Sequence, residues 1–126
     1  MQLKRVVVTG IGTITPIGNN LEDYWQGLIN GVPGAAPITL FDASKFKTRF
    51  ACEVKGFDPT SFMEKKEARK LDRFAQLALY ASDMAVVDAQ INKENVDADR
   101  VGVIFASGIG GLRTFQDEVS SFATGD

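Results

Sequence analysis

The feature that most constrains the fold is a segment, residues 74–89, that is apolar on nearly every face. Twelve of its sixteen residues are apolar or aromatic. The polar exceptions are Gln76, Ser82, Asp83 and Asp88. A helix of this kind has to be covered on most of its surface, as in the middle layer of a large protein. The chain has 126 residues, the size of one small domain, so we expect it to be unable to cover this helix by itself.

The pattern on either side of this segment predicts an α/β fold. Residues 3–9 (LKRVVVT) and 101–106 (VGVIFA) are short β-branched or apolar runs that end at glycine-containing turns. Such runs are typical of buried strands in parallel sheets. Helices are predicted after a cap at Asn19 or Asn20, ending before Gly31, and over residues 112–122.

The segments between these elements are predicted to be less regular. Residues 32–47 contain prolines and glycine without a sustained period and are interpreted as a connection. Residues 49–55 are compatible with a short edge strand, and a helical pattern begins at Asp58. The order of strand, helix, helix, strand and helix favours an α/β fold with right-handed crossovers.

The composition excludes several kinds of chemistry within this chain. Histidine is absent, so no Ser-His-Asp or Cys-His arrangement can be built from these residues. The single cysteine, Cys52, excludes an intramolecular disulfide, and we interpret it as a buried structural thiol rather than a nucleophile. The longest apolar run near the amino terminus, residues 6–8, is too short for a signal sequence or a membrane span, so a cytoplasmic location is expected.

Two glycine-rich turns follow the predicted strands. Gly10 and Gly12 have the spacing that begins a dinucleotide-binding motif, but Thr15 stands where the third glycine is required. In the second turn, residues 108–111, Arg113 takes the corresponding position and no Lys-Ser/Thr pair follows. We therefore interpret Gly10 and Gly12 as glycines that permit a positive φ and close packing in a sharp strand-to-helix turn, with nucleotide binding as the weaker alternative.

Four basic residues have the spacing of a single helix face. On one unbroken helix, Lys66, Arg69, Lys70 and Arg73 lie within an arc of about 100°. Residues 63–73 carry a net charge of +2, whereas the whole chain carries -2. A basic face on an acidic chain indicates an acidic partner, and the alternative is a solvated face without a partner. The overall charge gives no reason to expect nucleic acid binding.

In combination, five segments resemble the β-ketoacyl-[acyl-carrier-protein] synthases, and within that family the type II elongation enzymes. In chain order they are RVVVTGIG (5–12), TPIGN (15–19), FD (41–42), KEARKLDRF (66–74) and ASGIGGL (106–112). The resemblance runs from about residue 3 to the end of the chain. It implies that residues 1–126 are an incomplete amino-terminal part of a ketosynthase domain, with no complete independent domain.

This resemblance implies a thiolase-like α/β/α/β/α layered fold that pairs into a homodimer, with helix 74–89 near the central layer. The implied activity is acyl transfer, in which fatty acyl chains are elongated by decarboxylative condensation with malonyl-acyl carrier protein. No cofactor or metal is implied. The nucleophilic cysteine and two histidines of the family lie downstream of the matched region, so no catalytic residue is expected here, and Cys52 does not take that role.

The resemblance also assigns two functional roles within this chain. Lys66, Arg69 and Lys70 match positions that dock the acidic helix of the acyl- or malonyl-loaded carrier protein. Ile109, between Gly108 and Gly110, matches the residue at the inner end of the acyl pocket, and plain core packing is the alternative for it. For the whole protein, the alternative is a non-catalytic ketosynthase-like subunit that binds the carrier protein or sets chain length. Neither a nucleic acid partner nor a membrane span is expected.

Overall fold

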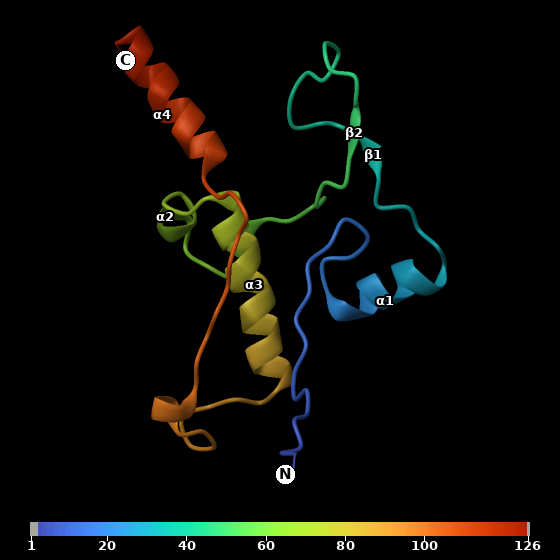
Figure 1. Cartoon of the computed structure of the whole chain (residues 1–126), viewed down its shortest axis with the longest axis vertical. Helices are drawn as coiled ribbons and strands as arrows, with labels where there is room; N and C mark the ends of the chain where they lie inside the picture. Colours follow the sequence, from blue (N-terminus) through green and yellow to red (C-terminus); the bar gives the residue numbers. More distant parts are fainter. Residues whose placement is uncertain (1–2, 126) are drawn as a thin grey trace. The chain divides into compact units, whose positions relative to one another are not determined.

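The computed structural model describes residues 3–125, and Figure 1 shows the course of the chain. The elements, in order, are α1 (Leu21–Ile29), β1 (Ala36–Pro37), β2 (Phe50–Ala51), the 3₁₀ turn η1 (Pro59–Ser61), α2 (Lys65–Ala68), α3 (Arg73–Asp88), the 3₁₀ turn η2 (Ala98–Arg100) and α4 (Leu112–Thr124). No helix within residues 3–125 is both long and apolar enough to cross a bilayer.

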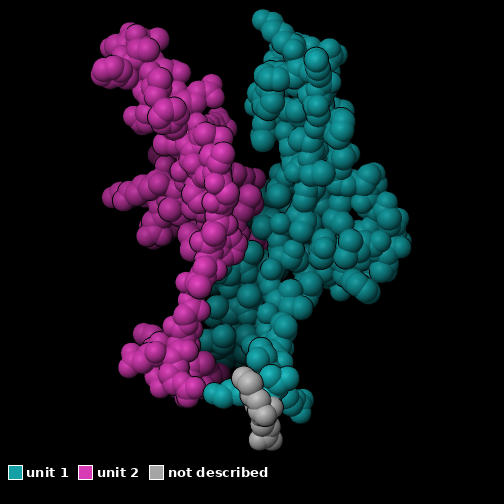
Figure 2. Space-filling view, in the orientation of Figure 1, with its two compact units in different colours: residues 1–57, 81–91 teal, residues 58–80, 92–126 magenta. Residues whose placement is uncertain are grey.

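The chain divides into two compact units, which Figure 2 distinguishes by colour. Among the described residues, unit 1 comprises 3–57 and 81–91, and unit 2 comprises 58–80 and 92–125. The boundary falls within α3, so the first half of this helix belongs to unit 2 and the second half to unit 1.

Helix α1 begins and ends where the sequence predicts. The side chain of Asn20 accepts a hydrogen bond from the backbone amide of Asp23 at 2.8 Å, which caps the first turn. After the helix ends, Gly31 adopts a φ of +62°, a conformation that favours glycine. The predicted helix and the Asn20 cap are confirmed.

In unit 1, the segment that contains Gly10 and Gly12 lies directly against the second half of α3. A Cβ added at Gly10 would come within 2.6 Å of the Ala89 backbone nitrogen, and one added at Gly12 within 2.7 Å of that of Ala85. Neither glycine has a positive φ, so the lack of a side chain is what the structure requires at these positions. The close packing is therefore confirmed, whereas the positive φ and the sharp turn at these glycines are not: the turn lies at residues 15–18, where Thr15 pairs with Gly18.

Strands β1 and β2 form a minimal antiparallel pair, with Ala36 opposite Ala51 and Pro37 opposite Phe50. The predicted edge strand is therefore confirmed for two residues only, and β1 lies within the predicted connection. Cys52 is exposed, so the prediction of a buried thiol was wrong. The physical reason is that β2 ends at Ala51 and a pair of two-residue strands is too short to provide a covered face.

Residues 3–9 and 101–106, predicted as buried strands, are not strands in the described chain. The only sheet among residues 3–125 is the pairing of β1 with β2. The predicted strand side chains are exposed, to 91% at Val6 and 97% at Ile104. This prediction was wrong because a strand requires hydrogen bonds to neighbouring strands, which a local apolar pattern does not supply.

Helix α3 confirms the predicted helix 74–89 to within one residue at each end. None of its residues is buried, and Val87 is 68% exposed. Among the described residues, the buried apolar side chains are Ala43 and Ala68 alone. The exposure of α3 agrees with the expectation that a chain of this length cannot cover such a helix.

Candidate functional site

The basic residues lie on two helices separated by a corner rather than on one unbroken helix. Helix α2 ends at Ala68, but Lys70 N donates to Glu67 O at 2.9 Å and Leu71 N to Ala68 O at 3.3 Å, so the turn continues in tighter form. A new helix then begins, since the carbonyl of Asp72 accepts from Gln76 N at 3.0 Å.

The prediction that four basic residues share one helix face is therefore wrong for one of them. Lys66, Arg69 and Lys70 remain on one helical run, whereas Arg73 is the first residue of α3. The physical reason is that the last hydrogen bond of the α2 turn joins Leu71 N to Ala68 O, whereas Arg73 belongs to the helix whose first hydrogen bond is accepted by the Asp72 carbonyl. Partial burial of the guanidinium lowers the pKa of Arg73. We call Lys66, Arg69 and Lys70 the basic corner.

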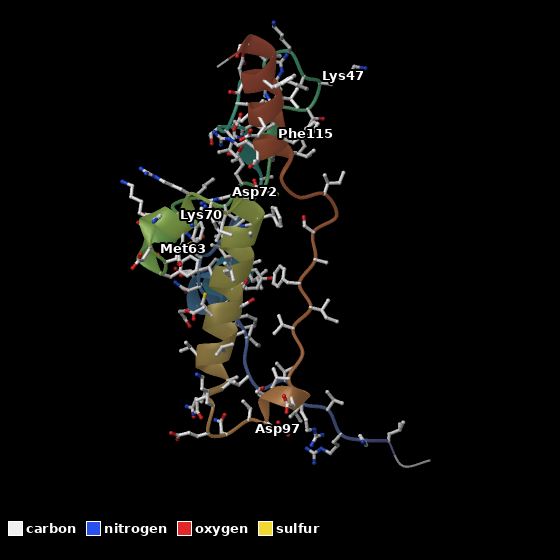
Figure 3. All side chains as sticks on the ribbon, turned by 90° about the vertical axis from the view of Figure 1, so that its left-hand side faces the viewer. Lys47, Met63, Lys70, Asp72, Asp97 and Phe115 are labelled. Carbon is white, nitrogen blue, oxygen red and sulfur yellow. The ribbon has the colours of Figure 1, made fainter. Side chains whose placement is uncertain are left out.

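The basic corner presents its charges to solvent without a partner in the described chain. All three side chains are exposed, and Figure 3 shows Lys70 near the junction of α2 and α3. Among residues 3–125, an ion pair forms elsewhere, between Arg113 and Asp117 on α4 at 3.8 Å. The basic corner is therefore available to a carboxylate from outside this part of the chain.

Lys65, the neighbouring cation, has a different local setting. The backbone amide and hydroxyl of Thr60 donate to the carboxylate of Asp58 at 2.9 and 2.8 Å. These hydrogen bonds, with a smaller attraction from Lys65, hold the pKa of Asp58 below its ordinary value. Lys65 therefore lies close enough to Asp58 to attract its carboxylate.

Gln76, in the first turn of α3, holds the basic corner in place. Its side-chain nitrogen donates to the carbonyls of Ala68 at 2.8 Å and Leu71 at 3.1 Å. The last carbonyls of a helix lack partners within that helix, so a donor from another element is stabilising there. Ala68 is only 5% exposed. The rings of Phe62, at the end of η1, and Tyr80, on α3, add an edge-to-face contact within unit 2, with centroids 5.2 Å apart.

The second predicted site, residues 108–110, lies in the turn before α4. A Cβ added at Gly110 would come within 2.7 Å of the Phe74 ring. Gly111 has a φ of +70° and stands at the N-cap position of α4. A Cβ added at Gly108 would meet nothing within 4 Å, and Ile109 is 75% exposed in this chain. The assignment of Ile109 to an acyl pocket stays a prediction.

The start of α3 contacts both the basic corner and residues 108–111, which we call the glycine turn. The carboxylate of Asp72 accepts a hydrogen bond from the hydroxyl of Thr114, in the first turn of α4. Figure 3 shows Asp72 at the end of α3 that faces α4. Neither Asp72 nor Gln76 was predicted as a site residue. An aspartate just before an apolar helix is a signal for a cap, but no local signal identifies a partner 42 residues away.

The described residues contain no further candidate for catalysis. No group of three or more Asp, Glu, Cys or His side chains suited to a metal ion is found within residues 3–125. Unit 1 has an open cavity of about 440 Å³. It is lined by residues between Thr15 and Val32 together with Lys55, and none of the predicted site residues contributes to it.

Residues 3–125 match the family described as β-ketoacyl synthase, N-terminal domain. The curated relatives include 3-oxoacyl-[acyl-carrier-protein] synthase 2 of Synechocystis sp., which is 52% identical over 118 residues, 94% of this chain and 28% of the relative. The protein of the same name in Coxiella burnetii is 41% identical over 124 residues, 98% of this chain and 30% of the relative.

Solved structures give the same result. A β-ketoacyl synthase from Burkholderia phymatum matches with a TM-score of 0.75 and 26% identity, over 98% of this chain and 31% of that chain. The ishigamide ketosynthase/chain length factor matches with a TM-score of 0.64 and 39% identity, over 71% of this chain and 22% of that chain. The chain thus spans less than a third of the length of each of these proteins.

Proposed function

The chain belongs to the β-ketoacyl synthase family, and we propose that the complete protein is a β-ketoacyl-[acyl-carrier-protein] synthase II, an acyltransferase that elongates fatty acyl chains. The fold class is a partial thiolase-like α/β fold. The observation that carries the proposal is the 52% identity, over 94% of this chain, to a protein named for the synthase 2 activity, since 3-oxoacyl and β-ketoacyl are names for the same group. The reaction is the decarboxylative condensation of malonyl-acyl carrier protein with an acyl chain held as a thioester.

The proposed contribution of the basic corner is to dock the acyl carrier protein. Three observations support this role: the side chains are exposed, they have no ion-pair partner among the described residues, and Gln76 fixes the turn that bears them. Each exposed pair with a carboxylate of the partner contributes roughly 0.2–1 kcal/mol. The corner therefore guides encounter and orientation, and its effect falls as the salt concentration rises.

The proposed contribution of Gly108, Ile109 and Gly110 is one wall of the acyl pocket. A β-branched side chain is stiff at its first torsion angle, so Ile109 is suited to stopping an acyl chain at a defined depth. The contact between Gly110 and the Phe74 ring supports this role because it limits movement of the turn. In this proposal, the facing walls come from parts of the protein beyond this chain.

The catalytic groups of the proposed enzyme lie outside this chain. The sequence has no histidine, and Cys52 is an exposed residue that follows β2 rather than a residue at a helix start. We propose that a cysteine and two histidines elsewhere in the protein form the thioester and stabilise the enolate. We also propose that the complete protein is a homodimer that acts in the cytoplasm.

The docking role is tested by reversing the charges of the basic corner in the complete protein. With Lys66→Glu, Arg69→Glu and Lys70→Glu combined, we expect the affinity for malonyl-acyl carrier protein to fall about tenfold or more at low salt. The difference from wild type should shrink at high salt. A matched control reverses three other exposed lysines: Lys45, Lys47 and Lys93. An unchanged affinity at low salt in the corner variant would exclude this docking surface.

The enzymatic role is tested by the intact mass of the complete protein after incubation with acyl-loaded carrier protein. We expect a covalent acyl adduct on a cysteine other than Cys52, so that a Cys52→Ala variant still acquires the acyl mass. If no adduct forms on any cysteine, the non-catalytic subunit is the correct interpretation and the proposed synthase activity is wrong.

A further inference from the structure

One carboxylate, that of Asp72, lies between the N-terminal ends of two helices. Its own backbone carbonyl accepts the first hydrogen bond of α3, from Gln76 N. Its side chain accepts from the hydroxyl of Thr114 on α4. A Cβ added at Gly111, the N-cap residue of α4, would come within 3.1 Å of the second carboxylate oxygen. The two carboxylate oxygens of Asp72 therefore lie on the first turn of α4.

Helix α4 depends on this outside carboxylate because it has no cap of its own. Its N-cap residue is Gly111, no side chain caps it, and its first turn contains no acidic residue. The amino end of a helix carries a partial positive charge and unpaired amide groups, which a nearby carboxylate stabilises. A hydrogen bond to an ionised group is also stronger than one between neutral groups.

The same turn of α3 holds the glycine turn at a second point. Phe74, two residues after Asp72, packs its ring against Gly110. The glycine turn is thus held on the upstream side by Phe74 and on the downstream side by Asp72. Ile109 precedes both contacts and has no close packing of its own in the described chain, where it is 75% exposed. Its position is set by these two contacts.

We propose that the hydrogen bond between Asp72 and Thr114 positions the glycine turn and so limits the length of acyl chain that the pocket accepts. This inference rests on the proposed function, in which Ile109 forms a pocket wall. Asp72 and Thr114 are positioning residues that act through Ile109 and do not touch the acyl chain. Loss of the hydrogen bond loosens the wall and lets longer chains enter.

The test is Thr114→Val in the complete protein, with kcat/KM measured for carrier protein loaded with a series of acyl chains. We expect the ratio for the longest over the shortest chain to rise about tenfold or more, the effect of one hydrogen bond to a charged group. Thr114→Ser retains the hydroxyl and should keep the wild-type ratio. Asp72→Asn retains an acceptor without the charge and should shift the ratio in the same direction by less.

A purely structural role gives a different result, because it lowers kcat/KM for all chain lengths in parallel. Such a parallel loss, or an unchanged ratio in both Thr114→Val and Asp72→Asn, overturns the inference. If Thr114→Val does not fold, the Asp72→Asn ratio decides the question.

Ile109→Phe separates this inference from the proposed pocket, since it should shorten the longest accepted chain, opposite in direction to Thr114→Val. If Ile109→Phe shortens the profile while the other two variants leave it unchanged, the positioning contact alone is wrong. If Ile109→Phe also has no effect, the assignment of the pocket wall is wrong as well.

Discussion

Glu53 shows how a single carboxylate organises a loop in unit 1. It accepts hydrogen bonds from the hydroxyl of Thr39 at 2.6 Å and from the backbone amides of Thr39 and Leu40. The Thr39 hydroxyl is the main cause that holds the pKa of Glu53 below its ordinary value. Because the pKa is lowered in the folded state, this carboxylate stabilises the loop fully above roughly pH 4.3, and the stabilisation is lost as the pH falls through the lowered pKa.

Replacing Thr39 by Val tests this arrangement. The variant removes the hydroxyl, so we expect the pKa of Glu53 to rise toward its ordinary value, as measured by NMR titration of labelled carboxyl carbons in the complete protein. Asp58 is the control, since its low pKa depends on Thr60 and should not change. A titration of Glu53 that is the same in both proteins contradicts the assigned cause.

Gly12 makes the closest approach to helix α3 and should tolerate no side chain. We expect Gly12→Ala to lower the free energy of unfolding of the complete protein by about 2 kcal/mol or more, since the added Cβ overlaps the helix backbone. Gly31→Ala is the comparison: it has a positive φ but open space around it, and should cost about 1 kcal/mol. Chemical denaturation measures both. A Gly12→Ala protein as stable as wild type would show that this packing does not hold.

At the scale of the elements, the helices could be predicted from sequence because their signals are local. The cap at Asn20, the apolar run within α3 and the glycine before α4 all lie within or beside the helix that they define. The strands could not, because residues 3–9 and 101–106 have the right side chains but find no neighbouring strand in the described chain. A pattern of apolar residues specifies which face is buried only when a partner is present.

The residues of the candidate site also divide into those with a local sequence signal and those without one. Lys66, Arg69 and Lys70 were found from their spacing, which needs only one turn of helix. The break before Arg73 was missed, although the aspartate that starts the new helix is visible in the sequence. The hydrogen bonds of Gln76 and Asp72 connect separate elements, and sequence spacing carries no information about such contacts.

Gln76 provides a test of whether α3 fixes the basic corner. In the complete protein, Gln76→Ala removes two hydrogen bonds to the end of the α2 turn. We expect the backbone amides of Lys70 and Leu71 to exchange with solvent about fivefold faster, the effect of roughly 1 kcal/mol. Gln26→Ala is the matched control, because Gln26 bonds only within the exposed face of α1, to Glu22. Equal exchange rates in wild type and Gln76→Ala would contradict the anchoring role.

At the scale of the whole molecule, the chain exposes apolar side chains from nearly all its elements. Besides Val6 and Ile104, they include Trp25 at 56% and Phe122 at 89% exposure. We therefore expect residues 1–126, expressed alone, to be inactive and poorly soluble, to bind a hydrophobic dye strongly and to unfold without a cooperative transition. Dye fluorescence and thermal denaturation check this. A monodisperse monomer that unfolds cooperatively would show that the chain is an independent domain.

The contact of Gly10 and Gly12 with α3 also sets the register between the two segments. Two residues of extended chain advance about 6.6 Å, and four residues of helix advance about 6 Å. The two glycines contact a row of alanines spaced by four, Ala81, Ala85 and Ala89. The spacing of the glycines therefore matches the spacing of the alanines along the helix. Sliding the helix by one residue would turn that row away by about 100° and bring larger side chains against the glycines. The two glycines thereby fix the position along α3 at which the preceding segment packs.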